Sequence, residues 1–584
     1  MARIEGMPSF YDELRHRNVI RVTIAYIAMA WLMIQVADTI LPAFEAPDWF
    51  LRVLIIVLAA GLFVVIPASW VFELTPKGIR RTDELPADYV VPRRAGRKID
   101  LAIIVILSLA LTTVVIDQYI LDRSVAPPVS TMAVLPLENV SGSPDKAYFV
   151  NGMTDALISN LSKISALRVT SRNSVMRFKD SDRSLPAIAA ELDVDAILTG
   201  SAALNNDRLQ ISVQLVDVSS DIVLWGETFD REFEDVFKLQ SEIASTIADR
   251  IRVDVTADEL AQLSAVAESS TDGYDDILRG MERFYRLTPQ DLEIAIDYFD
   301  RALEQNPDSA LALSGIAAAW VGLQQMGFVS PSIAAPNSEA ASLRALEVDP
   351  TLAAPHQWLA VIRAGIDYKW EEADELFIKA IDLNPNYSDA RTSYAHFLAA
   401  RGQFEEAFEQ SEISIELDPF NGWVLGVAGV IRYQANRLDD AARLLERALK
   451  VSPDLPFVWL VLAGVYQFQN RFEDAIKSEA SLLSAFGRVD ERDELLRIFR
   501  EEGFESALIW LSELTAANSS AVNAQGTWVA FRYARAGDTE NAIRWLLIAY
   551  EQADPNVVFL RMPEFEPLHR DPRIQELMVK LGIQ

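Results

Sequence analysis

The sequence predicts a multidomain chain with three N-terminal transmembrane helices, a small α/β domain and an all-α superhelix of repeated helix pairs. Three observations support this prediction: apolar stretches near the N-terminus, alternating strand and helix patterns in the next part, and a repeat period of about 34 residues after that. The expected parts are a cytoplasmic N-terminus (1–18), a three-helix transmembrane region (19–121) with a basic cytoplasmic loop (73–98), an α/β domain (129–255) and a repeat superhelix with a C-terminal cap (271–584).

The three apolar stretches are long enough to cross a membrane as helices. They are Val19–Leu41, Phe50–Phe72 and Ile99–Leu121. Each has about 23 residues, and a helix that rises about 1.5 Å per residue then covers a hydrocarbon core of about 30 Å. We expect the charged residues near their ends to anchor at the headgroups rather than to form an ion path.

Basic residues flank these stretches unequally, which predicts their orientation. Arginines precede the first stretch, and several Arg and Lys residues lie between the second and third stretches. The connection 42–49 between the first and second stretches carries no basic residue. Basic loops stay in the cytoplasm, so three crossings place everything after residue 121 on the other side. We therefore expect a bacterial inner-membrane protein with a cytoplasmic N-terminus and a large periplasmic C-terminal region.

The composition argues against several classes of function. The formal net charge is −31, and residues 1–121 hold twelve basic and twelve acidic residues, so the excess of acid lies in the remainder. Such a surface repels nucleic acid, and no nucleic-acid ligand is expected. The chain has no cysteine and only four scattered histidines. Without a zinc motif, a nucleophile elbow or a phosphate-binding glycine loop, we expect no catalytic residue, no metal and no cofactor.

Strand and helix patterns alternate between residues 130 and 255. The hairpin is the clearest element, because two alternating runs, Leu209–Val218 and Ile222–Phe229, are separated by three polar residues. The other expected strands are 131–137, 167–171 and 196–203, and the expected helices are 149–164, 185–192 and 235–252. This order predicts a mixed α/β domain in which βαβ units lead into an antiparallel hairpin.

Four short motifs in this segment carry a family resemblance. They are Ala133-Val134-Leu135-Pro136-Leu137, Gly152-Met153-Thr154-Asp155, Ala196-Ile197-Leu198-Thr199-Gly200-Ser201 and Leu224-Trp225-Gly226-Glu227-Thr228-Phe229-Asp230-Arg231. Together they resemble the TolB-like/FlgO-like amino-terminal domain family, whose members often continue into tetratricopeptide repeats. The leader motif Phe72-Glu73-Leu74-Thr75-Pro76 is also similar to that of TolB-like repeat membrane proteins. The resemblance implies a fold and a place in the cell envelope, and it implies no reaction.

Beyond residue 271, prolines recur with a nearly constant spacing of 43, 35, 34 and 34 residues, and a small residue stands five positions before each. The prolines are Pro307, Pro350, Pro385, Pro419 and Pro453, and the small residues are Ala302, Ala345, Ala380, Ser414 and Ala448. The pattern resembles the tetratricopeptide repeat, whose helix pairs stack into a right-handed superhelix with the first helices lining a concave face. The longer first spacing predicts an insertion or a lengthened loop. The last residues, from Met562, are similar to the closing segment of TolB-like repeat proteins and are expected to cap the superhelix.

Registering the repeats on their prolines places eight side chains on the concave face. They are Trp358, His396, Trp423, Tyr433, Gln434, Phe457, Gln467 and Phe468. Aromatic residues exposed in a groove are of the type that anchors peptide segments, so we predict that these residues bind protein partners. The alternative is that about half of them pack against the neighbouring repeat.

These observations predict a protein-binding scaffold that is anchored in the inner membrane and holds protein or peptide partners of the cell envelope in its repeat groove. The alternative is a transmembrane sensor that relays a periplasmic ligand or partner to a separate cytoplasmic effector. The cytoplasmic parts, of about 18 and 26 residues, are too short to fold an output domain of their own. An enzyme is not expected. The sequence leaves the partner and the oligomeric state open.

Overall fold

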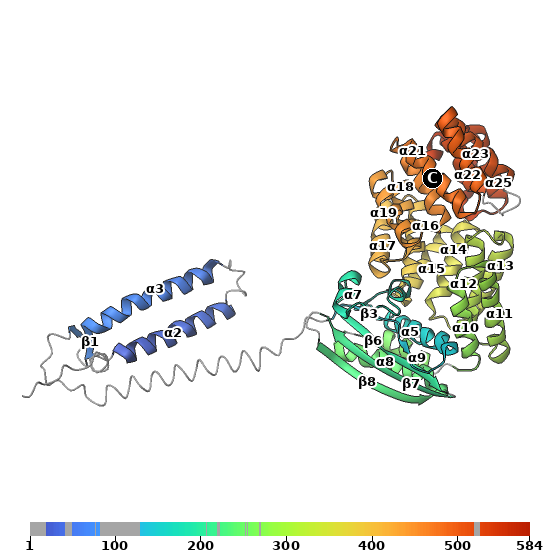
Figure 1. Cartoon of the computed structure of the whole chain (residues 1–584). Helices are drawn as coiled ribbons and strands as arrows, with labels where there is room; N and C mark the ends of the chain where they lie inside the picture. The colour runs from blue at the N-terminus through green and yellow to red at the C-terminus, as the bar shows by residue number, and fades with distance from the viewer. Residues whose placement is uncertain are drawn as a thin grey trace, which may run out of the picture. The chain divides into compact units, whose positions relative to one another are not determined.

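The computed structural model describes residues 19–40, 49–75, 78–81, 129–205, 207–218, 222–251, 253, 255–267, 270–518 and 526–583 of the 584-residue chain. The chain divides into two compact units, residues 1–127 and residues 128–584. Figure 1 shows the helical pair of the first unit and the sheet and helical repeats of the second.

The described part of the first unit consists of two long helices and a short hairpin. The helices α2 (Val19–Ile40) and α3 (Trp49–Val71) pack against each other. Directly after α3, the strands β1 (Phe72–Thr75) and β2 (Gly78–Arg81) pair in antiparallel fashion. This hairpin forms the beginning of the segment that the sequence predicts as a basic loop.

The prediction of three transmembrane helices is wrong. Among the described residues, no helix combines the length and the apolar character that a membrane crossing needs. The first two predicted stretches, Val19–Leu41 and Phe50–Phe72, correspond to α2 and α3, with Arg21 in the first turn of α2 and Arg52 in the first turn of α3. The third predicted stretch, Ile99–Leu121, lies outside the described residues, as do residues 1–18 and 82–98.

The second unit begins with a six-stranded mixed sheet. Its strand order is β5-β3-β6-β7-β8, with the short β4 paired to β6. The strand β3 runs parallel to both β5 and β6, whereas β6, β7 and β8 form an antiparallel meander. The strands are β3 (Thr131–Val134), β4 (Glu138–Asn139), β5 (Arg168–Val169), β6 (Ala196–Asn205), β7 (Arg208–Asp217) and β8 (Ile222–Glu232).

One face of the meander is packed into the core and the other is polar. Along β7, Leu209, Ile211, Val213 and Leu215 are fully buried, and the residues between them point to the opposite face. The buried side chains share a core with helices α5 and α8. The helices of this part are α5 (Ala147–Leu161), α6 (Arg172–Met176), α7 (Leu185–Leu192) and α8 (Val236–Ile251), with single 3-10 turns η4 (Pro144–Lys146) and η5 (Phe233–Asp235).

After a connecting helix α9 (Ala257–Ala267), eight helix pairs follow in the described residues (Figure 1). The pairs are α10 (Tyr274–Phe284) with α11 (Pro289–Gln305), α12 (Ala310–Gln325) with α13 (Pro331–Val348), α14 (Ala353–Gly365) with α15 (Trp370–Leu383), α16 (Ser388–Ala400) with α17 (Phe404–Leu417), α18 (Gly422–Gln434) with α19 (Leu438–Val451), α20 (Pro456–Phe468) with α21 (Phe472–Ala485), α22 (Val489–Glu502) with α23 (Phe504–Asn518), and α24 (Gly526–Arg535) with α25 (Thr539–Glu551).

The recurring small residues and prolines mark the ends of the second helices. All five small residues are fully buried, because the neighbouring helix packs directly on them. The residue before each proline caps the second helix, and its backbone N–H donates to the carbonyl of the small residue, as Asn384 does to Ala380. The longer first spacing has a different cause from a lengthened loop, since α12 and α13 have 16 and 18 residues, whereas α14 and α15 have 13 and 14.

The chain finishes with a closing segment, residues 554–583, that is not another helix pair. It contains the 3-10 stretches η6 (Pro555–Val558) and η7 (Pro563–Arg570) and the helix α26 (Pro572–Leu581). Its apolar side chains belong to the same buried core as those of α14 to α21, α24 and α25. The closing segment is therefore part of the interior of the repeats.

Candidate functional site: the concave face of the repeats

The first helices of successive pairs form the inner layer of the superhelix. From α10 to α20, each first helix contacts the first helix of the next pair. In a helical-repeat superhelix, this inner layer lines the concave face. The eight residues that the sequence predicts for that face lie on four of these helices: Trp358 on α14, His396 on α16, Trp423, Tyr433 and Gln434 on α18, and Phe457, Gln467 and Phe468 on α20.

The closing segment runs along this inner layer from α14 to α16. Pro555 lies against Gly365 at the end of α14, where an added Cβ would stand 2.9 Å from the Pro555 Cβ. Four residues later, the ring of Phe559 stacks on the imidazole of His396 in α16, with centroids 3.9 Å apart and planes inclined by 10°. Burial lowers the pKa of His396 to about 3, so its ring is neutral and stacks as an uncharged aromatic.

The next contact of the closing segment is a buried carboxyl on α18. The Tyr433 hydroxyl donates a hydrogen bond to Oε1 of Glu564, and both side chains are almost entirely buried. Burial raises the pKa of Glu564 to about 7, although the hydrogen bond from Tyr433 and the positive charge of Arg535 act in the opposite direction. The same carboxyl lies over Gly464 of α20, where an added Cβ would be 2.7 Å from Oε1.

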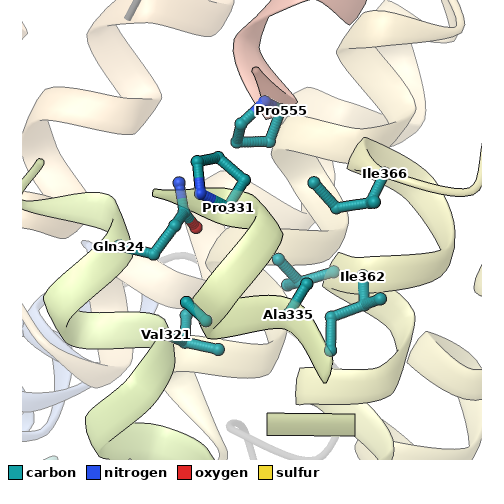
Figure 2. A pocket seen from close by; sticks show the side chains of 9 residues that line it. Val321, Gln324, Pro331, Ala335, Ile362, Ile366 and Pro555 are labelled. Atoms are coloured by element: carbon teal, nitrogen blue, oxygen red, sulfur yellow. The ribbon is translucent and has the colours of Figure 1, made fainter. Parts of the chain in front are cut away.

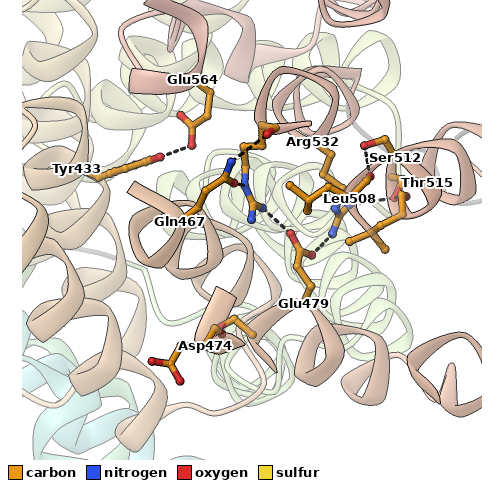
Figure 3. Close-up of polar contacts among 12 residues, drawn as sticks. Tyr433, Gln467, Asp474, Glu479, Leu508, Ser512, Thr515, Arg532 and Glu564 are labelled. Atoms are coloured by element: carbon orange, nitrogen blue, oxygen red, sulfur yellow. Dashed lines mark hydrogen bonds and ion pairs between the residues drawn. The ribbon is translucent and has the colours of Figure 1, made fainter. Parts of the chain in front are cut away.

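A buried ion cluster stands beside this carboxyl (Figure 3). Glu479 on α21 accepts from Arg532 at 2.9 Å and from Arg535 at 2.6 Å, both on α24, and its side chain has no exposed surface. Burial opposes the ionisation of Glu479, but the two guanidinium groups outweigh it and hold the pKa of the carboxyl below its ordinary value. Gln467 connects α20 to this cluster, since it exchanges two hydrogen bonds of 2.9 Å with Arg535.

The structure thus gives three of the eight predicted residues direct contacts within the chain. His396 faces Phe559, Tyr433 faces Glu564, and Gln467 is bonded to Arg535. Phe468 packs edge-on against Tyr433 at 6.1 Å and is 40% exposed.

The other four differ in their surroundings. Trp423 and Phe457 are half-buried and pack edge to face at 5.0 Å. Trp358 packs against the core shared with the α/β part, and Gln434 is buried. Partner binding by these eight residues stays a prediction.

Sequence reasoning missed Phe559 and Glu564. The motif around Met562 and Pro563 suggested a cap at the end of the superhelix, and the contacts of Phe559 with α16 and of Glu564 with α18 were not part of that prediction. The available indication was the apolar content of residues 557–568, because such side chains are usually buried.

A small cavity lies where the closing segment meets α12, α13 and α14. Val321, Pro331, Ile362 and Pro555 are among its lining residues (Figure 2). Its volume of about 20 Å³ is enough for one water molecule and far below the several hundred Å³ of a small-molecule site. Across the described part of the chain, no three His, Cys, Asp or Glu side chains are placed to hold a metal ion.

The α/β part is joined to the repeats through hydrogen bonds to its backbone. Asn386, in the turn before α16, donates from Nδ2 to the carbonyls of Ser162 at 3.0 Å and Leu167 at 2.8 Å, and its Oδ1 accepts from the N–H of Val169 at 3.1 Å. The bond to Val169 connects β5, at the edge of the sheet, with this repeat turn.

Charged groups also lie at this joint, the contact between the α/β part and the repeats. Arg172 forms an ion pair of 2.7 Å with Asp155 and stacks 3.5 Å over the ring of Tyr285 at the end of α10. Burial raises the pKa of Asp155 to about 6 despite this ion pair. Nearby, burial and the charge of Asp418 raise the pKa of Asp389 to about 7.

Different family models match the α/β part and the repeats. Residues 376–409 and 432–485 match two tetratricopeptide-repeat family models, which confirms the repeat assignment. Residues 129–246 match the model described as the second domain of HilA/YgeH-like transcriptional regulators. The TolB-like/FlgO-like family expected from the sequence motifs is therefore not the one found for this segment.

Two curated proteins are similar over part of their length. A putative adenylate cyclase 3 of Rhizobium meliloti is 32% identical over 191 residues, which are 33% of this chain and 32% of that protein. Human tetratricopeptide repeat protein 6 is 31% identical over 114 residues, which are 19% of this chain and 22% of that protein. The chain thus spans about a third of the first relative and about a fifth of the second.

Solved structures with helical repeats are also similar. A tetratricopeptide-repeat protein of Thermus thermophilus is 17% identical, covers 33% of this chain and 99% of its own, and has a TM-score of 0.28. For PilF of Pseudomonas aeruginosa the corresponding values are 21%, 35%, 98% and 0.26. From the family models, the helical part of this chain consists of tetratricopeptide repeats, which form a protein-interaction fold.

Proposed function

We propose that this protein is a scaffold that binds a segment of a partner protein on the concave face of its tetratricopeptide repeats. The observation that carries the proposal is the row of aromatic side chains on the inner layer. Trp423 and Phe457 are half-buried neighbours on α18 and α20, and Phe468 at the end of α20 is 40% exposed. Large, partly desolvated aromatic residues supply most of the binding energy at protein interfaces.

The joint between the α/β part and the repeats supports a scaffold role. Because Asn386 bonds directly to the backbone of Val169 in β5 and of Leu167 just before it, the sheet and the repeats are held together at this strand. A partner that binds the repeats is then held at a fixed position relative to the sheet. This arrangement suits a protein that brings two other proteins together.

The name of one relative does not extend an activity to this chain. The rhizobial protein is named a putative adenylate cyclase, but this chain spans only about a third of it. A cyclase activity is therefore not part of the proposal. The expectation from sequence that the protein is not an enzyme stays a prediction.

A photo-crosslinking amino acid at Phe468 tests the concave face in living cells. The matched control is the same amino acid at Ile378, which has a similar exposure of 43% but lies on the second helix α15. We expect a defined crosslinked protein from position 468 and none from position 378. The proposal fails if position 468 gives no adduct or if both positions give the same adducts.

A periplasmic location and partners in the cell envelope are also proposed, on the acidic excess and the absence of cysteine. A phosphatase fused after the last residue should be active there, and a fluorescent protein that folds only in the cytoplasm should stay dark. The opposite pattern would place the repeats in the cytoplasm. The crosslinking result at position 468 is independent of this outcome.

A further inference from the structure

We propose that the closing segment is an internal ligand of the concave face, which occupies the place of a partner segment and displays the chemistry that such a partner needs. This inference rests on the proposed function, because it takes the inner layer of the repeats as the binding surface. It adds what occupies that surface in the free protein and what kind of segment can replace it.

The first support is the path of the closing segment. In chain order, Pro555 meets α14, Phe559 meets α16 and Glu564 meets both α18 and α20. All four are first helices of their pairs, so residues 555–564 cross successive repeats along the inner layer, whereas the end of the segment contacts the second helices α15 and α25. A partner peptide held on the concave face would follow the same course.

The second support is the conformation of the segment. It has 3-10 stretches at Pro555–Val558 and Pro563–Arg570, with an extended residue, Met562, just before the second. Proline at positions 555, 563 and 567 prevents an ordinary helix over this length. Up to Arg570 the segment therefore consists of short 3-10 stretches joined by Phe559–Met562, and it does not form an α-helix of a helix pair.

The third support is the shape of the surface under it. Two glycines of the inner layer lie where the segment approaches most closely: Gly365 under Pro555 and Gly464 under Glu564. A Cβ at either position would come within 3 Å of the segment, and real Cβ atoms do not approach so closely. The inner layer thus has room for backbone and side chains of a segment at these two points.

The contacts define the partner by its chemistry. His396 presents a neutral ring that takes an aromatic side chain, and Tyr433 presents a hydroxyl donor near the positive Arg535. The occupant therefore needs an aromatic residue and, five positions later, a carboxyl side chain that can accept from Tyr433. We infer that partners are proteins with a proline-containing segment of this pattern.

The alternative is that the closing segment is a permanent part of the core. Phe559, Leu560 and Phe565 are buried, as core residues are. The two possibilities differ in what happens when the covalent connection is cut. If the segment is a ligand, it exchanges with a free peptide and the repeats stay folded. If it is a core element, the repeats unfold when it dissociates.

The experiment uses the full chain with a protease site inserted at Ala553, a turn residue with φ of +54° between α25 and η6. The control protein carries the same site at Gly487, between α21 and α22, where an added Cβ would meet no atom within 4 Å. After cleavage, a fluorescein-labelled synthetic peptide of residues 554–584 is added and its anisotropy is measured. Circular dichroism follows the helical content of both cleaved proteins.

We expect the protein cut at 553 to stay helical and to bind the labelled peptide by exchange. Uncut protein should bind it at least about a hundredfold more weakly, because its own segment is tethered at high effective concentration. Protein cut at 487 should also bind it more weakly, because its closing segment stays joined to α22–α25, which pack on the remaining repeats. A peptide with Phe559→Ala and Glu564→Ala should bind at least about tenfold more weakly than the unchanged peptide.

Two results would overturn the inference. The first is loss of the helical signal after cleavage at 553 but not at 487, which would make the segment a core element. The second is a folded, cleaved protein that binds the changed and unchanged peptides equally. Neither result bears on the crosslinking test at Phe468, which uses the uncut protein, so failure of the inference and failure of the proposed function are distinguishable.

Discussion

Asn386 and Val169 form the central hydrogen bond between the repeats and the sheet: the side-chain Oδ1 of Asn386 accepts from the backbone N–H of Val169 at 3.1 Å. Val169 lies on β5, whose other edge pairs with β3. An edge strand of a sheet exposes unpaired backbone groups, and here a repeat side chain satisfies one of them. The bond connects residues 217 positions apart in the chain.

Replacing Asn386 by alanine should therefore loosen this joint. The change leaves the N–H of Val169 and the carbonyls of Ser162 and Leu167 without the amide that bonds them. We expect the free energy of unfolding to fall by about 2 to 3 kcal/mol, the cost of leaving buried polar groups unpaired. Urea titration followed by circular dichroism measures it. Asn337→Ala, which removes an exposed amide from α13, should cost less than about 0.5 kcal/mol.

Asp389 should make the stability of the joint depend on pH. Burial and the charge of Asp418 raise its pKa to about 7 in the folded chain, above the ordinary value of 3.8. The folded state therefore binds this proton more tightly than the unfolded state, and the associated stability is complete below pH 3.8 and is lost as the pH rises through 7.

Asp389→Asn should consequently stabilise the protein at pH 8, by about 1 to 2 kcal/mol, and should bring little gain at pH 4. Thermal unfolding at the two pH values measures the difference from the wild type. Asp382→Asn, at an exposed position of α15, controls for the loss of one negative charge from an acidic protein. A gain of the same size at both pH values would show that Asp389 is not the titrating group.

Local patterns predicted the repeats and the hairpin well. Helix packing every 34 residues demands small residues at fixed positions, and Ala380 and Ser414 are fully buried as expected. The hairpin predicted at Leu209–Val218 and Ile222–Phe229 forms as β7 and β8, because alternation of apolar and polar residues is enforced by one buried face. These features depend on residues that are neighbours in sequence or recur with the repeat.

Long-range contacts were not predictable in this way. The register of the repeats placed Tyr433 on the inner layer, but nothing in its neighbourhood shows that Glu564, 131 residues later, covers it. The prediction of transmembrane helices is overturned by the structure, in which no described helix is long and apolar enough for a membrane crossing. Neither question can be settled from a window of local sequence.

The buried cluster around Glu479 allows the contribution of a buried counter-charge to the free energy of unfolding to be measured. Glu479→Gln would leave the guanidinium groups of Arg532 and Arg535 without their shared counter-charge. Removing one partner of a buried ion pair costs about 3 to 5 kcal/mol, so we expect the midpoint of urea unfolding to fall strongly. The matched change Glu473→Gln breaks an exposed pair with Lys477 and should cost less than about 1 kcal/mol. Similar losses in the two variants would mean that burial of the cluster contributes nothing.

Tyr433→Phe tests how much the hydrogen bond to Glu564 stabilises the closing segment on the repeats. The variant keeps the ring that packs on Phe468 but removes the hydroxyl that bonds Glu564, so the carboxyl stays buried without its donor. The segment should then open more often, and hydrogen exchange at the amides of residues 559–568 should become about tenfold faster, which corresponds to about 1.4 kcal/mol. Mass spectrometry of peptic fragments measures this rate. Tyr394→Phe removes a comparable hydroxyl, bonded to Asp374 at 3.0 Å away from the closing segment, and should leave the exchange there unchanged. Unchanged exchange in Tyr433→Phe as well would mean that apolar packing alone fixes the segment.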